Sequence, residues 1–260
     1  MGRKILITSG KGGVGKTTIV AGLSKTLAAK NYSVCVVDGD MGLNNLDLIM
    51  GVEDKVVYDM ADCIAGKCQI KQAIVKDEKM HNLFTMPASK KITQEVFSFS
   101  QILNKLASIF DFVLVDSPAG IDDGFLRASK PCCEAFVVVT PHISSIRDAS
   151  KVLSILKSDQ TKTNIKVVVN RIRGDLVASG EMINHKDIEN LLMTELVGIL
   201  PESDNYNIVG SFENLNIDNG FCEAFKILAQ NVCEDKFIEY DYISEYKGFF
   251  GYFKRKLKRL

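Results

Sequence analysis

A glycine-rich octapeptide near the start of the chain places the tightest constraint on its fold. Residues 10–17 read Gly-Lys-Gly-Gly-Val-Gly-Lys-Thr and match the phosphate-loop pattern G-x-x-x-x-G-K-[ST] at every fixed position. An apolar run at residues 5–7 precedes this loop, and a helical pattern at residues 17–30 follows it. A strand, a glycine-rich turn and a helix in this order predict a site for the phosphates of a nucleotide, bound by backbone N–H groups at the positive end of the helix.

The residue types in this loop suit that task. Glycines let consecutive N–H groups turn toward the phosphates without Cβ clashes. The ammonium group of Lys16 can reach the outer phosphates, and the hydroxyl of Thr17 can ligate Mg²⁺. The residues that we expect to contact the nucleotide in this segment are Gly10, Lys11, Gly12, Gly13, Val14, Gly15, Lys16, Thr17 and Thr18.

Short apolar runs rich in β-branched residues recur along the chain and alternate with helical patterns. Near-continuous apolar runs are typical of strands that are buried on both faces of a parallel sheet. The sequence therefore predicts a three-layer α/β/α sandwich with a mainly parallel, doubly wound sheet. The expected strands are residues 5–8, 34–37, 83–86, 112–115, 135–140, 165–169 and 196–200, and the expected helices are residues 17–30, 57–65, 99–109, 145–157, 186–195 and 223–231.

Acidic residues directly follow two of these runs. Asp38 and Asp40 come after the second run, and Asp116 comes after the fourth. The carboxyl ends of parallel strands meet at the edge of the sheet where nucleotides bind, so both Asp38 and Asp40 can face the phosphates. Apolar residues followed by Asp form the Walker B arrangement, which puts the carboxylate of Asp116 near the metal ion. An ordinary acidic turn after residues 34–37 is the other interpretation.

Composition excludes several other classes of protein. The chain has 260 residues, of which 46% are hydrophobic and 25% charged, as expected for one large globular α/β domain. No apolar run approaches the about 18 residues of a membrane span, and the N-terminal run is too short for a signal peptide. The seven cysteines are odd in number and include no C-x-x-C pair. We expect reduced thiols and a cytoplasmic protein.

The formal net charge of +0 hides a basic tail. Residues 247–260 hold six lysines and arginines and no acid, so the preceding 246 residues carry −6. On a helix, the apolar side chains of this tail fall within an arc of about 100°, with most of the basic ones outside it. This pattern favours an amphipathic helix on an anionic membrane surface. A helix that docks on the body and a nucleic-acid tail are the alternatives. The membrane residues are Phe249, Phe250, Phe253, Lys254, Arg255, Leu257, Lys258 and Leu260.

Residues 11–18 resemble the deviant Walker A loop of the ParA/MinD family of ATPases. Residues 38–47 are similar to the first switch segment of that family, D-x-D-x-G-L-x-N-L-D, and residues 116–121 are similar to its second switch. The resemblance implies an ATP-dependent homodimer in which Lys11 reaches the nucleotide of the partner subunit.

The same resemblance implies roles for further residues. It makes Lys11, Lys16 and Asp40 catalytic, with Asp40 orienting the attacking water. It places Asp38 near Mg²⁺, with Thr17 and Asp116, and the N–H of Gly120 near the γ-phosphate. It assigns Asn170 and Pro201 to the adenine, and it assigns Asn45, Arg147 and Asp148 to the dimer and partner surface.

The resemblance also implies a function. In the division-site group of this family, an ATPase that is slow without an activating partner dimerises with ATP on the inner face of the cell membrane. There it recruits a MinC-like inhibitor of the division ring and responds to a MinE-like activator. A regulator of flagellar number is the close alternative. A DNA-partitioning ATPase is the more distant one, since we expect no nucleic-acid partner. The expected division is an ATPase domain at 1–233, an acidic linker at 234–246 and the membrane helix at 247–260.

Overall fold

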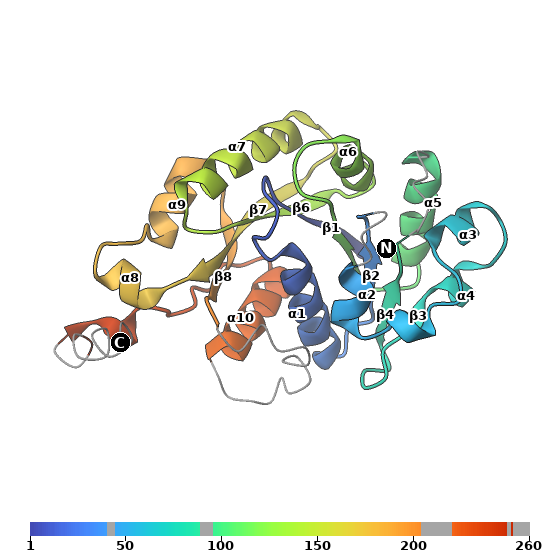
Figure 1. Ribbon diagram of the computed structural model, residues 1–260, viewed down its shortest axis with the longest axis horizontal. Helices are drawn as coiled ribbons and strands as arrows, with labels where there is room; N and C mark the ends of the chain where they lie inside the picture. The colour runs from blue at the N-terminus through green and yellow to red at the C-terminus, as the bar shows by residue number, and fades with distance from the viewer. Residues whose placement is uncertain (41–44, 89–95, 204–219, 249–250, 252–260) are drawn as a thin grey trace.

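The computed structural model describes residues 1–40, 45–88, 96–203, 220–248 and 251. An eight-stranded sheet in the order β3-β4-β2-β5-β1-β6-β7-β8 forms its centre (Figure 1). All neighbouring strands are parallel except β3 and β4. The strands are β1 (Arg3–Thr8), β2 (Val34–Asp38), β3 (Val75–Lys76), β4 (Leu83–Met86), β5 (Phe112–Asp116), β6 (Glu134–Val139), β7 (Asn164–Ile172) and β8 (Leu196–Pro201).

Helices cover both faces of this sheet because its strands are apolar on both sides. Successive residues of β1 show the alternation: Leu6 belongs to one core cluster, and Ile5 and Ile7 belong to the other. The cluster around Leu6 packs α5, α6, α7 and α9 on one face, whereas the second cluster packs α1 and α10 on the opposite face. The helices are α1 (Lys16–Ala29), α2 (Asn45–Met50), α3 (Met60–Ile64), α4 (Ile70–Ala73), α5 (Val96–Ala107), α6 (Asp123–Ser129), α7 (Ile143–Ser158), α8 (Gly174–Ala178), α9 (His185–Leu192) and α10 (Gly220–Glu234).

The predicted fold class is confirmed, and all seven predicted strands are present. The eighth, β3, has two residues and runs antiparallel to β4, so its apolar pattern is too short to detect. The short helices α2, α4, α6 and α8 were not predicted either, because four to seven residues do not establish a helical period. None of the helices in the described ranges combines the length and hydropathy that crossing a bilayer requires.

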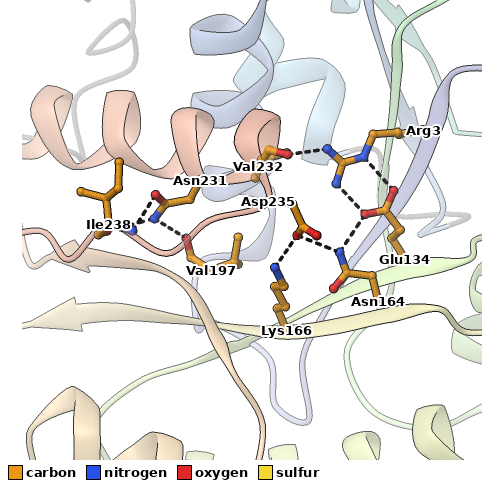
Figure 2. A network of polar contacts seen from close by, with 9 residues as sticks. All are labelled: Arg3, Glu134, Asn164, Lys166, Val197, Asn231, Val232, Asp235 and Ile238. Atoms are coloured by element: carbon orange, nitrogen blue, oxygen red, sulfur yellow. Dashed lines mark hydrogen bonds and ion pairs between the residues drawn. The ribbon is translucent and has the colours of Figure 1, made fainter.

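A polar network joins the starts of β1, β6 and β7 to the end of α10 (Figure 2). Arg3 makes two hydrogen bonds to the carboxylate of Glu134, with N–O distances of 2.8 and 2.6 Å, and also donates to the carbonyl of Val232. Asp235, just after α10, lies 2.5 Å from the Lys166 ammonium group. These contacts fix the end of α10 at the edge of the sheet where the parallel strands begin.

The chain then continues as an ordered segment, residues 235–248, which we call the C-terminal strap. Its residues Ser244–Tyr246 form the 3₁₀ turn η3. Asn231 of α10 holds the strap through hydrogen bonds to the N–H and carbonyl of Ile238. Tyr240 packs against both core clusters, so the strap crosses the edge of the sheet beyond β8.

The strap is anchored again where it reaches α8 and α9. Tyr242 is 7% exposed, and its hydroxyl lies 2.8 Å from Nδ1 of the buried His185. A Cβ on Gly174 would come within 1.8 Å of the Tyr242 carbonyl oxygen, so the strap backbone packs directly on the start of α8. The strap therefore ends on the body of the protein, next to α8 (Figure 1).

Candidate functional site

The loop between β1 and α1 has the conformation that its glycines allow. Gly15 adopts φ 97°, a left-handed conformation that L side chains rarely take. A Cβ there would also lie 2.4 Å from the side-chain nitrogen of Asn170. A residue larger than glycine therefore conflicts with both the backbone and the neighbouring strand at this position.

Helix α1 begins directly after this turn without a side-chain cap. Its N-cap residue, Gly15, supplies no side-chain cap, and the first turn contains no acidic residue. The first N–H groups of a helix have no partner within the helix and carry partial positive charge. At the start of this 14-residue helix they are suited to bind the phosphates of a nucleotide.

Two buried carboxylates lie side by side at the carboxyl edge of the sheet. Asp38 ends β2 and Asp116 ends β5, and the two residues pair in the register of these parallel strands. They are only 2% and 4% exposed. One Asp38 oxygen accepts a hydrogen bond of 2.9 Å from the backbone N–H of Asp40. Strand register thus brings together acids that are far apart in sequence.

Burial perturbs the ionisation of this group of side chains. It raises the pKa of Asp38 to about 8 and that of Asp116 to about 6, and nearby carboxylates add to both shifts. Burial also raises the pKa of Asp40, against the opposing effect of Lys16. The pKa of Lys16 is lowered by burial, although Asp116 and Asp40 favour its charged form. The cluster holds more negative than positive groups and is therefore suited to a cation.

The residues around Asp116 fit a magnesium ion. Its Oδ1 is buried without a hydrogen-bond partner, and the nearby Thr17 hydroxyl acts to lower the pKa of Asp116 against the effect of burial. Mg²⁺ prefers oxygen ligands from one or two carboxylates together with substrate phosphates. Thr17, Asp38 and Asp116 provide such oxygens next to the loop.

A cavity of about 650 Å³ opens over these groups. This volume lies within the about 300–1,000 Å³ of small-molecule sites. The loop, the carboxyl ends of β2 and β5 and helix α2 form its walls. The predicted residues that line it are Gly12, Gly13, Gly15, Lys16, Thr17, Asp38, Asp40 and Asp116.

Other predicted nucleotide ligands are already engaged in hydrogen bonds. The N–H of Gly120 donates to the Ser9 carbonyl at 2.9 Å, so contact with a γ-phosphate requires this bond to break. The side-chain amide of Asn170 donates to the Val14 carbonyl at 2.8 Å and braces the loop from β7. Pro201 pairs with Ile172 at the end of β8 and is not among the residues that line the cavity.

The predicted partner residues lie around the rim of the site. Lys11 is exposed and does not line the cavity, and Thr18 is half-buried in the first turn of α1. Arg147 is exposed in α7, and a Cβ on Gly10 would clash with the backbone of Asp148. The first turns of α7 therefore pack against the loop. Asn45 begins α2.

The predicted membrane residues all lie outside the described residues. Residues 249–250 and 252–260 contain all eight of them, namely Phe249, Phe250, Phe253, Lys254, Arg255, Leu257, Lys258 and Leu260.

Four residues that line the cavity lie outside the predicted motifs. Leu48 and Ile49 line the cavity from α2 and are 53% and 37% exposed. Asp122 lines it one residue after the second switch motif, which was the available signal. Arg171 lines it because its φ of 59° and a register shift between β7 and β8 redirect the strand. No sequence pattern predicts such a bulge at a residue other than glycine.

Comparisons with known proteins agree with this architecture. The profile of the CobQ/CobB/MinD/ParA nucleotide binding domain matches residues 5–215. The septum site-determining protein MinD of Thermotoga maritima is 37% identical, with 100% of both chains covered. A chain of the MinC:MinD cell division protein complex of Aquifex aeolicus superposes with a TM-score of 0.84 at 36% identity, covering 91% of this chain and 97% of that one. The septum site-determining protein MinD of Pyrococcus horikoshii, complexed with Mg-ADP, gives a TM-score of 0.77 at 28% identity, covering 89% and 96%.

Proposed function

The chain belongs to the MinD group of the CobQ/CobB/MinD/ParA nucleotide-binding family, and we propose from this premise that it is an ATPase that helps to place the division site. The observation that carries the proposal is the cavity in which Lys16, Asp40 and Asp116 converge beside the uncapped start of α1. We propose that this cavity takes ATP and Mg²⁺, and that the protein dimerises with ATP on the inner face of the cell membrane.

In this proposal the loop and its neighbours hold the triphosphate. The N–H groups of the loop and of the first turn of α1 bind phosphate oxygens, and Lys16 carries positive charge toward the outer phosphates. Thr17, Asp38 and Asp116 hold Mg²⁺, which supplies positive charge against the phosphate oxygens when bound. Burial raises the pKa of Asp38 and of Asp116. A cation bound beside these carboxyl groups opposes that effect and favours their ionised forms.

Asp40 is the residue that we assign to the attacking water. Its side chain lines the cavity and is only half-buried, unlike those of Asp38 and Asp116. The positive charge of Lys16 acts on it from within the cavity, and Asp122 opposes that effect from the rim. A carboxylate placed there can orient a water molecule and accept its proton. We propose slow turnover until an activating partner such as a MinE-like protein completes the site.

The exposed rim of the cavity is the surface that we assign to the second subunit and to partners. Lys11 is exposed and does not line the cavity of its own subunit, so its side chain can contact a nucleotide bound to the partner subunit. Arg147 and Asp148 lie on α7, which packs against the loop at Gly10, so a change of the nucleotide bound by the loop can alter their positions. Similarity to a chain of a MinC:MinD complex supports a MinC-like partner for this surface.

The tail at 247–260 is the proposed membrane helix. Basic residues near an anionic bilayer each contribute about 1 kcal/mol, so one short helix binds marginally. Two tails held in one dimer gain about 10²–10⁴ in avidity. ATP-dependent dimerisation would then control residence on the membrane. We keep the division into a domain at 1–233, a linker at 234–246 and a helix at 247–260, and we add that the linker is docked on the ATPase domain through Ile238 and Tyr242.

The test is ATP-dependent sedimentation with anionic liposomes, run beside an assay of ATP hydrolysis. The truncated chain should end at Gly248, because this end keeps Tyr246, which packs on Gly174 and is lost from any chain that ends before it. We expect pelleting with ATP, little with ADP, and loss of pelleting on truncation with hydrolysis retained. Pelleting that ignores the nucleotide contradicts the membrane switch but not the ATPase. Steeply salt-dependent binding to duplex DNA without pelleting would favour the DNA-partitioning alternative.

A further inference from the structure

Two cysteines outside the nucleotide site face each other at close range. Cys63 lies in α3 and Cys68 lies two residues before α4, and their sulfur atoms are 3.3 Å apart. Both side chains are partly exposed. All seven cysteines lie in the described part of the chain, and no other pair there is in hydrogen-bond contact. The C-x₄-C spacing gives no signal in the sequence, because it differs from the C-x-x-C pair that is typical of redox sites.

The backbone already holds the two cysteines in place. The N–H of Gly66 donates to the Cys63 carbonyl at 3.1 Å, and the N–H of Lys67 donates to the Asp62 carbonyl at 2.9 Å. Gly66 has a φ of 71°, as expected for a left-handed residue that ends a helix. Capping boxes fix the starts of α3 and α4 as well. A bond between the sulfurs would therefore close a short loop that is already ordered, with little further chain entropy to lose.

A cavity of about 580 Å³ adjoins the pair and shares no lining residue with the nucleotide cavity. Its size is in the range of small-molecule sites. Cys63 and Cys68 form part of its wall, together with apolar side chains such as Ile102 of α5. Lys71 and Lys105 also line it, and they give it a positive rim with no acidic residue among its lining residues. Such a cavity is suited to a small anionic molecule.

We propose that Cys63 and Cys68 form a reversible dithiol–disulfide site that exchanges with a small anionic disulfide bound in this cavity. This assignment is independent of the proposed ATPase and adds a modification site to the protein. Disulfides in reducing compartments, when they occur, are commonly transient and redox-sensing. The proposed site has the partial exposure and the neighbouring second thiol that such sensors need.

The exchange balances in two steps. The Cys68 thiolate attacks one sulfur of the disulfide R–S–S–R, forming a mixed disulfide and releasing R–S⁻. The Cys63 thiolate then attacks the Cys68 sulfur and releases the second R–S⁻. Two protein thiols are oxidised, one small disulfide is reduced, and the two cysteine protons end on the two released thiols. Burial raises the pKa of Cys63, and contact with the Cys68 thiol adds to this effect until Cys68 has entered the mixed disulfide.

The test uses the full chain and glutathione disulfide as the probe. After incubation, free thiols are alkylated and the protein is digested with trypsin. Cleavage after Lys67 separates Cys63 from Cys68 in the reduced protein, whereas the disulfide keeps the two peptides joined. We expect the joined peptides, the loss of two alkylated cysteines and reversal by dithiothreitol. Full alkylation of both cysteines, or glutathione retained on Cys68, would overturn the proposal.

Variants separate the parts of the proposal. Cys63→Ser should stop at a glutathione adduct on Cys68, and Cys133→Ser, which removes an exposed cysteine outside the cavity, should form the Cys63–Cys68 disulfide normally. In the double variant Lys71→Gln, Lys105→Gln, the preference for glutathione disulfide over the neutral hydroxyethyl disulfide should be lost. Equal rates with both disulfides in the unmodified protein would contradict anionic docking.

Discussion

Single residues at the nucleotide cavity differ in how far the sequence could predict them. Motif positions such as Lys16 and Asp116 were predictable because their chemistry depends on local spacing in the chain. Asn170 was predicted to contact adenine, a role that stays a prediction, and its amide braces the loop at Val14. Arg171 was missed because its place in the cavity depends on a positive φ and a strand irregularity. Tertiary geometry of this kind leaves no local signature.

Replacing Gly15 by alanine should distort the loop, although the substitution adds only a methyl group. The left-handed backbone there costs about 1–2 kcal/mol for an L side chain, and the added Cβ would lie 2.4 Å from the Asn170 nitrogen. We expect a lower thermal midpoint and loss of nucleotide binding, measured by scanning calorimetry and by titration with ADP. Gly12→Ala is the control for stability, because a Cβ there meets nothing within 4 Å. Equal midpoints for the two variants would contradict this account.

Asp40→Asn should separate binding from hydrolysis. The amide keeps the size of the side chain but cannot accept the proton of water, so we expect hydrolysis to fall by about 10²-fold or more. Binding of ADP should change little, since the loop and Lys16 remain. Asp123→Asn, an exposed residue outside the cavity, provides the matched control for both assays. If Asp40→Asn hydrolyses ATP at the original rate, another group must position the water.

Among the elements, long strands and helices were predicted well and short or irregular ones were not. Helix α7 begins at Ile143 with His142 as its N-cap, and Ser145 lies inside the helix, where its hydroxyl accepts a hydrogen bond from the Thr140 N–H. The apolar period still located this helix because its five buried apolar residues repeat on one face. The C-terminal strap has no period of its own, so its docking could not be predicted.

Asn231 should be a strong determinant of stability because it fixes the strap. It is 1% exposed, and its amide bonds the carbonyls of Val197 and Ile238 and the N–H of Ile238. Removing it takes this partner from one buried and two part-buried backbone groups, and we expect Asn231→Ala to lower the unfolding free energy by about 2–4 kcal/mol. Urea titration measures this loss. Gln230→Ala, one residue earlier and bonded only to Glu234 among the contacts described, should change it little.

His185 should make the strap sensitive to acid. Burial lowers its pKa below the usual 6.5, against the opposing effect of Glu239, so the folded protein holds it neutral. The unfolded chain binds a proton more readily, and stability from this residue is therefore complete above about pH 6.5 and declines as the pH falls toward the lowered value. Urea titrations between pH 7.5 and 5 should show a steeper decline for the native chain than for His185→Gln. Parallel declines would contradict this role.

At the scale of the whole molecule, the sequence predicted the three-layer sandwich but not the contacts that join the two ends of the chain. The apolar runs identify buried parallel strands, and parallel strands require helical crossovers on both faces. The network around Arg3 unites residues from opposite ends of the chain, so no local pattern predicts it. The pairing of Asp38 with Asp116 was implied once both strands were placed at the same edge.

Glu134→Ala should weaken the whole molecule because it leaves the Arg3 guanidinium without its carboxylate at the junction of β1, β6 and α10. The lost charge-assisted bonds predict a decrease of about 1–3 kcal/mol in unfolding free energy, measured by urea titration. Glu78→Ala removes an ion pair of similar length to Lys55 at an exposed site, and the midpoint should not move. A similar loss of unfolding free energy in both variants would mean that the network stabilises the protein no more than an exposed ion pair does.

The docking of the strap also bears on how the protein avoids associating with itself. A sheet presents unpaired backbone groups at its two outer strands, and these can recruit strands from other chains. Here β3 is only two residues long, and the strap crosses the edge beyond β8, with Tyr240 packed against both faces. Shortening the chain to a point before Tyr240 would uncover β8 and turn it into a template for aggregation. Insolubility of such a truncated protein would then reflect an exposed sheet edge.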